Sequence, residues 1–315
     1  QCASTNARAD EGPKTAIVSL QAILAHADEH APRMIVGRAR LERGQAAVDG
    51  AAVVLQDNLL AGAMVGPRFS EGERGIDYQF WLRQPIEIAG ERKQRRHAAE
   101  ELRELTSKEL AETDWLVHRE VHAAFHNALV ARERWKLVDK IVVSTEELLS
   151  VAERRLQAGD ISPLAVRLAE GELAQARQAS LTAERGYRVS QLELAEVAGW
   201  PASTLPEPRG ELDVPRMAPP VTELLALARR QHPGLAARSS AVDAAEARVK
   251  LEKREGWPEP SIGATYTRES IPAARLYEHL IQGVITFPIP TSQRNQAARA
   301  EARAELAARH AEERD

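Results

Sequence analysis

Three histidines at intervals of four residues are the side chains with the clearest capacity for chemistry. His118, His122 and His126 would form one stripe on a helix, because residues four apart lie on the same face. Two histidines one turn apart can chelate a divalent cation such as zinc. The segment is HREVH, however, and Arg119 stands where a zinc protease carries its general base. Neutral histidines on a half-buried helix face give the same pattern, and we favour that interpretation.

No other group of residues predicts catalysis. The sequence has no glycine-rich phosphate loop, no Ser/His/Asp group close in sequence and one cysteine, Cys2, so no disulfide can form within the chain. We therefore expect no enzyme and no cofactor. The chain begins Gln-Cys-Ala-Ser without an initiator Met, which indicates a segment of a longer protein. Cys2 is a candidate for lipid attachment, but Gln1 is not the small residue expected before such a cysteine, so we favour a signal-peptide remnant.

The composition favours long packed helices over a compact enzyme core. Of 315 residues only 4% are aromatic, whereas 43% are hydrophobic and 28% are charged. The net charge of −4 gives no field that attracts a polyanion, so nucleic acid is not an expected partner. No apolar run reaches the eighteen residues of a transmembrane helix.

A helical hairpin is predicted for residues 91–197. Residues 91–158 lack glycine and proline, and their apolar residues recur every three or four positions, which indicates one amphipathic helix. At 1.5 Å per residue this helix would be about 100 Å long. Gly159 can take the left-handed cap conformation, Ser162 can cap the next helix, and Pro163 suits its first turn. A helix returning over residues 164–197 completes the hairpin, whose tip is at about residues 158–163.

Two pairs of alternating segments are predicted as β-strands. Residues 58–68 and 75–88 form one pair, and residues 261–270 and 277–289 form the other. A period of two gives one apolar and one polar face, although Trp81 breaks the alternation. Each segment has about the ten residues that a strand needs to cross a membrane. The pattern alone favours ordinary surface hairpins; four membrane strands would require several chains to share one barrel, because four cannot enclose a channel.

The chain is predicted to contain a duplication. Pro32 and Pro233 are 201 residues apart, and Gly90-Glu-Arg92 corresponds to Ser292-Gln-Arg294 at a spacing of 202. Residues 1–199 would be the first repeat, with a strand pair at 58–88. A proline-rich linker at 200–220 would lead to an incomplete second repeat at 221–315, with a strand pair at 261–289.

The junctions from strand to helix share a pattern in both repeats. Proline ends the strand ladder, and a short loop then begins the helix. Arginines after the junctions would anchor near lipid headgroups or belong to a solvated helix start. The residues concerned are Pro85, Gly90 and Arg92 in the first copy and Pro288, Pro290 and Arg294 in the second.

Four stretches together resemble one protein family. They are QPIEIAGERKQRR at residue 84, FPIPTSQRNQAAR at residue 287, RRLQAGDISPLAVRLAEGELAQAR at residue 154, and the segment that begins HPGLAARSSAVDAAEARV at residue 232. They resemble TolC-like outer membrane factors, and within these the CzcC-type heavy-metal efflux branch. The resemblance covers about residues 17–308.

The resemblance implies a fold that is mainly α with membrane β. Each protomer of a homotrimer would give four strands to a shared twelve-stranded barrel in the outer membrane lipid. Helices would form an α-barrel in the periplasm. A periplasmic adaptor and an inner-membrane RND pump would be the partners of this passive exit duct. The adaptor would dock on the hairpin tip, at Arg155, Leu156, Gly159, Asp160, Ile161, Ser162, Pro163 and Leu164.

Each part of this interpretation has an alternative. A hairpin tip needs Gly, Ser and Pro simply to turn the chain. Ile161 and Leu164, however, have little core to fill there and favour a surface that binds a partner.

The family has a second long hairpin, and this chain ends at Asp315, so we expect apolar helix faces to be exposed. A soluble coiled-coil scaffold is the alternative function, and a metal-binding or sensor protein that uses the histidine stripe is a third. Two matched strand pairs favour the channel.

Overall fold

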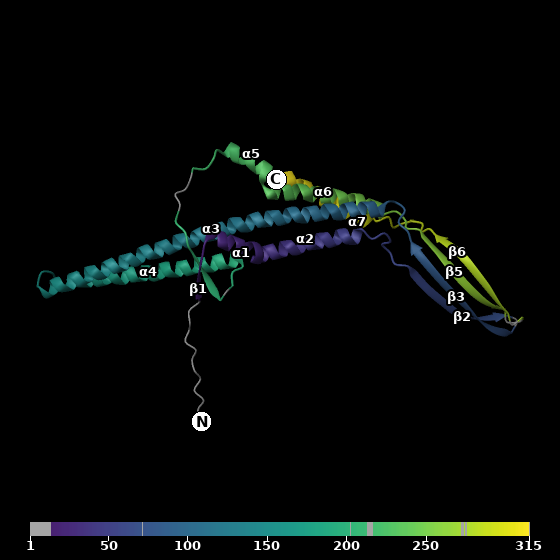
Figure 1. Ribbon diagram of the computed structural model, residues 1–315, viewed down its shortest axis with the longest axis horizontal. Helices are drawn as coiled ribbons and strands as arrows, with labels where there is room; N and C mark the ends of the chain where they lie inside the picture. The colour runs from purple at the N-terminus through teal and green to yellow at the C-terminus, as the bar shows by residue number, and fades with distance from the viewer. Residues whose placement is uncertain are drawn as a thin grey trace, which may run out of the picture. The chain divides into compact units, whose positions relative to one another are not determined.

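The computed structural model describes residues 14–70, 72–201, 203–212, 217–271, 274 and 276–314 (Figure 1). They form two compact units. The first contains the described residues within Gln1–Ala39 and Leu110–Gln231, and the second those within Arg40–Glu109 and His232–Asp315. No helix among the described residues has both the length and the apolar composition needed to cross a membrane.

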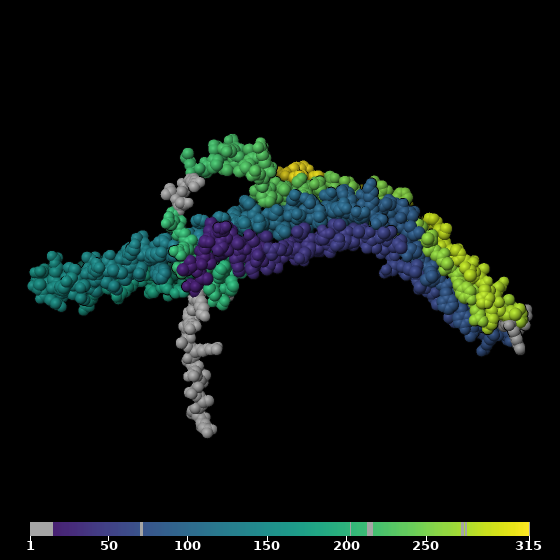
Figure 2. Space-filling model, in the orientation of Figure 1, coloured from purple at the N-terminus to yellow at the C-terminus, as the bar shows by residue number. Residues whose placement is uncertain are grey.

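The first unit contains the tip of the predicted helical hairpin. Helix α3 covers Glu91–Gln157 and α4 covers Pro163–Ala198, so the prediction is confirmed to within a residue or two. The turn closes where the backbone N–H of Asp160 donates to the carbonyl of Arg155 at 2.9 Å, and Gly159 has φ 79°. Ser162 is the N-cap of α4 without a side-chain capping bond. Figure 2 shows this part of the chain as a slender rod.

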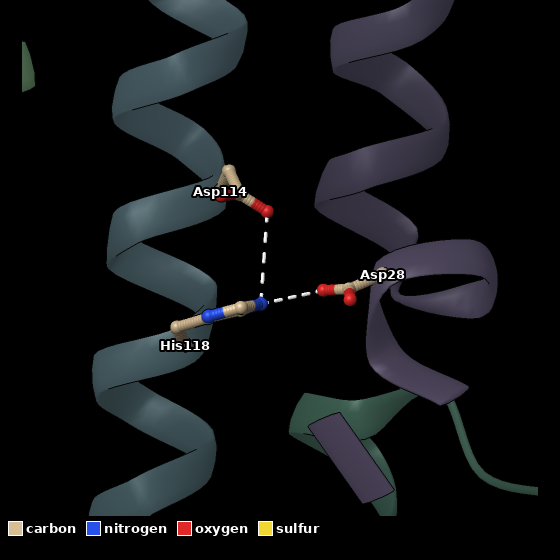
Figure 3. A group of neighbouring side chains, drawn as sticks. All are labelled: Asp28, Asp114 and His118. Carbon is tan, nitrogen blue, oxygen red and sulfur yellow. Dashed lines mark hydrogen bonds and ion pairs between the residues drawn. The ribbon is translucent and has the colours of Figure 1, made fainter. Parts of the chain in front are cut away.

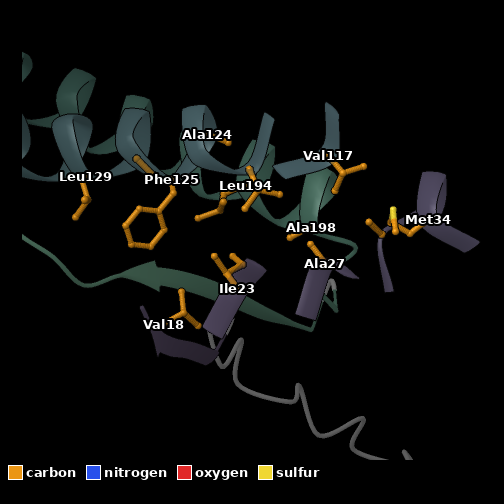
Figure 4. Close-up of a cluster of buried hydrophobic side chains, with 13 residues drawn as sticks. Val18, Ile23, Ala27, Met34, Val117, Ala124, Phe125, Leu129, Leu194 and Ala198 are labelled. Atoms are coloured by element: carbon orange, nitrogen blue, oxygen red, sulfur yellow. The ribbon is translucent and has the colours of Figure 1, made fainter. Parts of the chain in front are cut away.

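One apolar core holds the first unit together. Helix α1 (Leu20–His30) and the start of α2 (Pro32–Ala51) pack on α3 and α4 (Figure 4). Ile23, Val121 and Leu194 are fully buried there. The complete cluster is Val18, Ile23, Ala27, Ala31, Met34, Val117, Val121, Ala124, Phe125, Ala128, Leu129, Leu194 and Ala198. Helix α5 (Val221–Gln231) also belongs to this unit and has no buried residue.

A parallel strand pair lies beside this core and was not predicted. Strand β1 (Lys14–Val18) pairs with β4 (Thr204–Pro208), which lies inside the stretch interpreted as a linker. Pro206 and Pro208 cannot donate to a ladder, which argued against a strand. Their carbonyls still accept hydrogen bonds: Gln191 Nε2 donates to Pro206 O at 3.0 Å, and Arg132 donates to Pro208 O.

The second unit contains both predicted strand pairs. Strands β2 (Leu60–Ser70) and β3 (Glu73–Pro85) form one antiparallel hairpin, and β5 (Ser261–Ile271) and β6 (Leu276–Thr286) form the other. The hairpins are joined by antiparallel pairing of β3 with β5, which gives one sheet in the order β2-β3-β5-β6. Helices α6 (Pro233–Arg254) and α7 (Gln296–Arg314) pack together in the same unit.

The order of elements recurs along the chain. Helix, proline, helix and strand pair occur twice, and Pro32 and Pro233 each begin the second helix. Leu60 and Ser261 begin the strand pairs at the same separation of 201 residues. This spacing fits the predicted duplication, while the division of the sequence into two repeat domains remains a prediction.

Gly199 gives a direct test of the packing in the first unit. It ends α4 with φ 64°, and a Cβ there would lie 2.3 Å from the backbone oxygen of His30. We expect Gly199→Ala to lower the free energy of unfolding by about 2–4 kcal/mol, through left-handed strain and overpacking. Thermal unfolding followed by circular dichroism in detergent measures this.

The matched control is Gly186→Ala in the middle of α4, where a Cβ meets nothing within 4 Å. It should raise the stability by about 0.5–1 kcal/mol, because alanine is the better helix former. Equal melting temperatures for the two variants would contradict the packing described here.

Candidate channel strands, junctions and hairpin tip

Cross-strand register gathers most of the apolar side chains on one face of the four-stranded sheet. Paired residues share a face, and successive residues of a strand alternate between faces. Phe80 is in register with Tyr266, which is in register with Ile281, and Leu82 occupies the next row of the same face. Ile281 is 78% exposed. We call this the apolar face: Ala61, Ala63, Val65, Ile76, Tyr78, Phe80, Leu82, Ile262, Ala264, Tyr266, Tyr277, Ile281 and Ile285.

The opposite face carries most of the polar residues. Arg68 bonds Asp77 and Glu269 across three strands, with both N–O distances 2.8 Å. We call this the polar face, and its polar members include Arg68, Asp77, Gln79, Arg83, Thr265, Thr267, Glu269, Glu278 and Gln282. This face also carries some apolar side chains, which are Leu60, Met64, Ile271, Leu276, Leu280 and Val284. A sheet with one mainly apolar, exposed face and one mainly polar face matches the strands of an outer membrane barrel, which alternate between lipid and a watery interior.

Trp81 is the departure from strict alternation that the sequence pattern showed, and the structure explains its position. Trp81 lies on the polar face in register with Gly62. A Cβ on Gly62 would lie 2.3 Å from the indole, so the ring covers the glycine. The Arg83 guanidinium lies 5.0 Å from the ring centroid. The indole therefore packs against backbone and a cation instead of joining the apolar face.

An aromatic and arginine cluster lies on the apolar face near the hairpin ends. The guanidinium carbon of Arg268 is 3.7 Å from the ring centroid of Tyr277 and 5.8 Å from that of Tyr78. Tyrosine is enriched where membrane strands reach the lipid–water interface. The cluster is therefore of the type found at the rim of a membrane barrel.

The first junction leads from β3 into α3. Pro85 ends the strand, and Gly90, with φ 81°, directly precedes the helix. Arg92 donates to the carbonyl of Ala52 at 3.1 Å. Arg92 therefore makes a contact within the protein, and its role at lipid headgroups remains a prediction.

The second junction uses Asn295, which the sequence analysis missed. It directly precedes α7 with φ 56°, as Gly90 precedes α3, so the repeat comparison that matched Gly90 with Ser292 is wrong in register at this point. Asparagine is the residue after glycine that most readily adopts this conformation. Its Nδ2 donates to Glu252 Oε2 at 2.8 Å. Pro288 and Pro290 precede it, and Arg294 Nε donates to Pro290 O at 3.3 Å.

The predicted tip residues meet at one turn of the first unit. Arg155, Gly159, Asp160, Ser162 and Pro163 are all exposed, and Leu156 and Ile161 are half-buried. Leu164 is 67% exposed. The turn thus presents apolar surface beside a cation and a carboxylate, while the predicted adaptor contact remains a prediction.

The three histidines of the stripe do not converge on one point. His118 faces Asp28, with Nε2 2.5 Å from Oδ1, and also Asp114 at 3.7 Å (Figure 3). The rings of His122 and His126 are stacked with centroids 6.2 Å apart, and His126 Nδ1 lies 2.7 Å from the carbonyl of His122. Cys2 lies outside the described residues.

Residues 24–200 match the family described as "Outer membrane efflux protein". The chain belongs to the outer membrane efflux protein family. It is 29% identical over 212 residues to the cobalt-zinc-cadmium resistance protein CzcC of Cupriavidus metallidurans, a stretch that covers 67% of this chain and 50% of that protein. The chain thus spans about half the length of this curated relative.

Solved channel structures share the fold of this efflux family chain. A membrane protein from Pseudomonas aeruginosa matches with a TM-score of 0.69 at 19% identity, over 93% of this chain and 72% of that one. The Campylobacter jejuni CmeC outer membrane channel matches with a TM-score of 0.72 at 13% identity, over 94% and 66%.

Family membership decides several predictions. This efflux family consists of transport channels and not enzymes, so the expectation that the chain is no enzyme is confirmed. The chain is located in the outer membrane, and its helical part lies in the periplasm. The predicted fold of long helices with membrane strands is also confirmed. The soluble coiled-coil scaffold is not supported.

Carboxylates lie near both junctions of this efflux protein, and one of them is buried. Glu91 is 1% exposed, and its Oε2 accepts from the backbone N–H of Ala89 at 2.9 Å. Glu255 and Glu259 are exposed. Partial desolvation by neighbouring atoms still raises the pKa of Glu259, and a hydrogen bond with Asp57 raises it further. Partial desolvation likewise raises the pKa of Glu255. The folded state favours the protonated forms of Glu255 and Glu259. Their contribution to the free energy of unfolding is therefore present at low pH and is lost as the pH rises through the folded-state pKa values.

Glu259→Gln tests this pH dependence. Glutamine has a similar shape and no charge, so the variant should melt at a higher temperature than the parent at pH 8. Below the ordinary pKa of glutamate, about 4.3, the two proteins should melt alike. The control Glu104→Gln loses only a helix-surface pair with Lys108 and should not melt higher at pH 8. A parent-like Glu259→Gln at pH 8 would refute the effect.

Proposed function

We propose that this chain forms part of the wall of an outer membrane exit duct. The duct would belong to a tripartite efflux system that exports divalent heavy-metal cations. The observation that carries the proposal is the four-stranded sheet, with its exposed apolar face and its opposite polar face. A sheet of this kind needs lipid on one side and water on the other. The long helical hairpin that follows β3 supplies the periplasmic wall.

The two unpaired edges of the sheet lead us to propose a homotrimer. Its outer strands β2 and β6 each pair on one side only within the described residues. Four strands do not enclose a channel, and unpaired strand edges are not stable in lipid. If β2 of one copy pairs with β6 of the next, three copies give a closed barrel of twelve strands without a free edge.

The proposed cargo, divalent heavy-metal cations, is inferred from the similarity to CzcC, and the carboxylates of the polar face are compatible with it. CzcC is named for resistance to cobalt, zinc and cadmium, and it shares 29% identity with this chain. The polar face offers the carboxylates of Asp77, Glu269 and Glu278, two of which are already paired with Arg68. Paired carboxylates contact a passing cation weakly, and conduction requires such easy release.

The periplasmic adaptor docks on the hairpin tip in this proposal. Leu164 and Ile161 at the exposed turn provide apolar surface, and Arg155 and Asp160 provide charges at the rim. A periplasmic adaptor would cover this surface and connect the duct to an RND pump in the inner membrane.

Metal accumulation tests the proposal. Deletion of the gene that encodes this chain should raise the cobalt, zinc or cadmium content of cells grown in the metal, measured by mass spectrometry of washed cells. The parent gene should restore the lower content. Unchanged content of all three metals would overturn the proposed cargo, and a raised content of an organic toxicant instead would reassign it.

Two variants in the same cells test the docking surface. Leu164→Ala should restore export poorly and should crosslink less to the adaptor. Leu181→Ala is the control, because Leu181 is similarly exposed on α4 but lies about five turns from Leu164. Equal restoration by both variants would contradict docking at the tip.

A further inference from the structure

Asp28, Asp114 and His118 bring three possible metal ligands together in the first unit. Asp28 lies near the end of α1, and Asp114 and His118 lie one turn apart on α3 (Figure 3). One ligand atom from each lies within 4.8 Å of the others, and no other group of three or more among the described residues does so. Two elements of the core therefore meet at an imidazole and two carboxylates.

One imidazole cannot satisfy both carboxylates. His118 Nε2 is the atom that faces both, at 2.5 Å from Asp28 Oδ1 and 3.7 Å from Asp114 Oδ1. A ring nitrogen carries at most one hydrogen, and 3.7 Å is too long for a hydrogen bond. A cation between the three atoms would contact all of them.

The surrounding charges favour a cation. Two carboxylates face the site, and the carbonyl end of α1 adds partial negative charge. The arginines that follow α1 have other partners: Arg33 pairs with Glu120 at 2.8 Å, and Arg38 donates to the carbonyl of Glu29 at 3.1 Å. Neither of these bonds directs a positive charge to the two aspartates.

The geometry requires small movements of the carboxylates. Zinc binds histidine nitrogen and carboxylate oxygen at about 2.1 Å, so tetrahedral ligand atoms lie about 3.4 Å apart. The separation of His118 and Asp114 is already close to this value. Asp28 must withdraw from His118 by about 1 Å to admit the ion. Its side chain is 44% exposed and can rotate.

We propose that Asp28, Asp114 and His118 bind one divalent transition cation, with water completing its coordination. The imidazole selects this class, because magnesium and calcium prefer oxygen ligands alone. The site is open to solvent. The proposal depends on this geometry alone and not on which cargo the channel exports. It also connects α1 to α3, so an occupied site stabilises the first unit.

Zinc titration of the purified chain in detergent tests the site. Isothermal titration calorimetry should show one equivalent bound, and Asp114→Asn and Asp28→Asn should each weaken the affinity tenfold or more. Both substitutions preserve side-chain shape, and circular dichroism checks that the variants fold. Zinc should raise the melting temperature of the parent more than that of either variant.

His122→Gln is the matched control, because His122 is the stripe neighbour of His118 at i+4 and lies outside the three-residue group. It should bind zinc as the parent does. Parent-like affinity in both asparagine variants would overturn the site, and so would loss of binding in His122→Gln, which would assign zinc to the histidine stripe. Neither result would bear on metal accumulation in cells.

Discussion

Every backbone N–H and C=O within the hydrocarbon of a membrane must find its partner inside the protein. In this chain that constraint acts on eleven- to thirteen-residue strands. Pairing of β3 with β5 removes two edges, although these strands lie far apart in sequence. The proposed pairing of β2 with β6 of a neighbouring copy removes the remaining two. The sheet thus accounts for both the fold of one chain and its assembly.

The same constraint explains where the strands end. Proline closes the ladder of β3 at Pro85, where a missing N–H costs little. Gly90 and Asn295 then take left-handed conformations that turn the chain into α3 and α7. Each junction is fixed by contacts to a different part of the second unit, such as the bond from Asn295 to Glu252. Exposed apolar residues on the hairpin, among them Leu148, Leu168 and Leu192, fit a wall that packs against other helices.

The sequence was informative where the signal is local. A helical period without glycine or proline predicted α3, and Gly159 with Pro163 predicted its turn, because these preferences act within a few residues. The strand pairs were predicted for the same reason. Pairing of β3 with β5, by contrast, depends on contacts between distant segments. Strand β4 was missed because its prolines argued against a strand, and only the structure shows that their carbonyls are used.

The candidate sites show the same division. The histidine stripe was visible in the sequence, and Asp114 stood one turn before His118. Asp28 could not be assigned to this group, since it reaches His118 only when α1 packs on α3. Asn295 carried a usable signal, an asparagine directly before a helix, but comparison with Gly90 placed the equivalent residue at Ser292.

The central claim is that the free edges of the sheet are closed by other copies of the chain. The mass of the protein extracted from outer membranes in mild detergent, measured by native mass spectrometry, tests it most directly. The account predicts a complex of three copies. A monomer that remains folded and membrane-embedded would contradict it, because its sheet would then keep two unpaired edges in lipid.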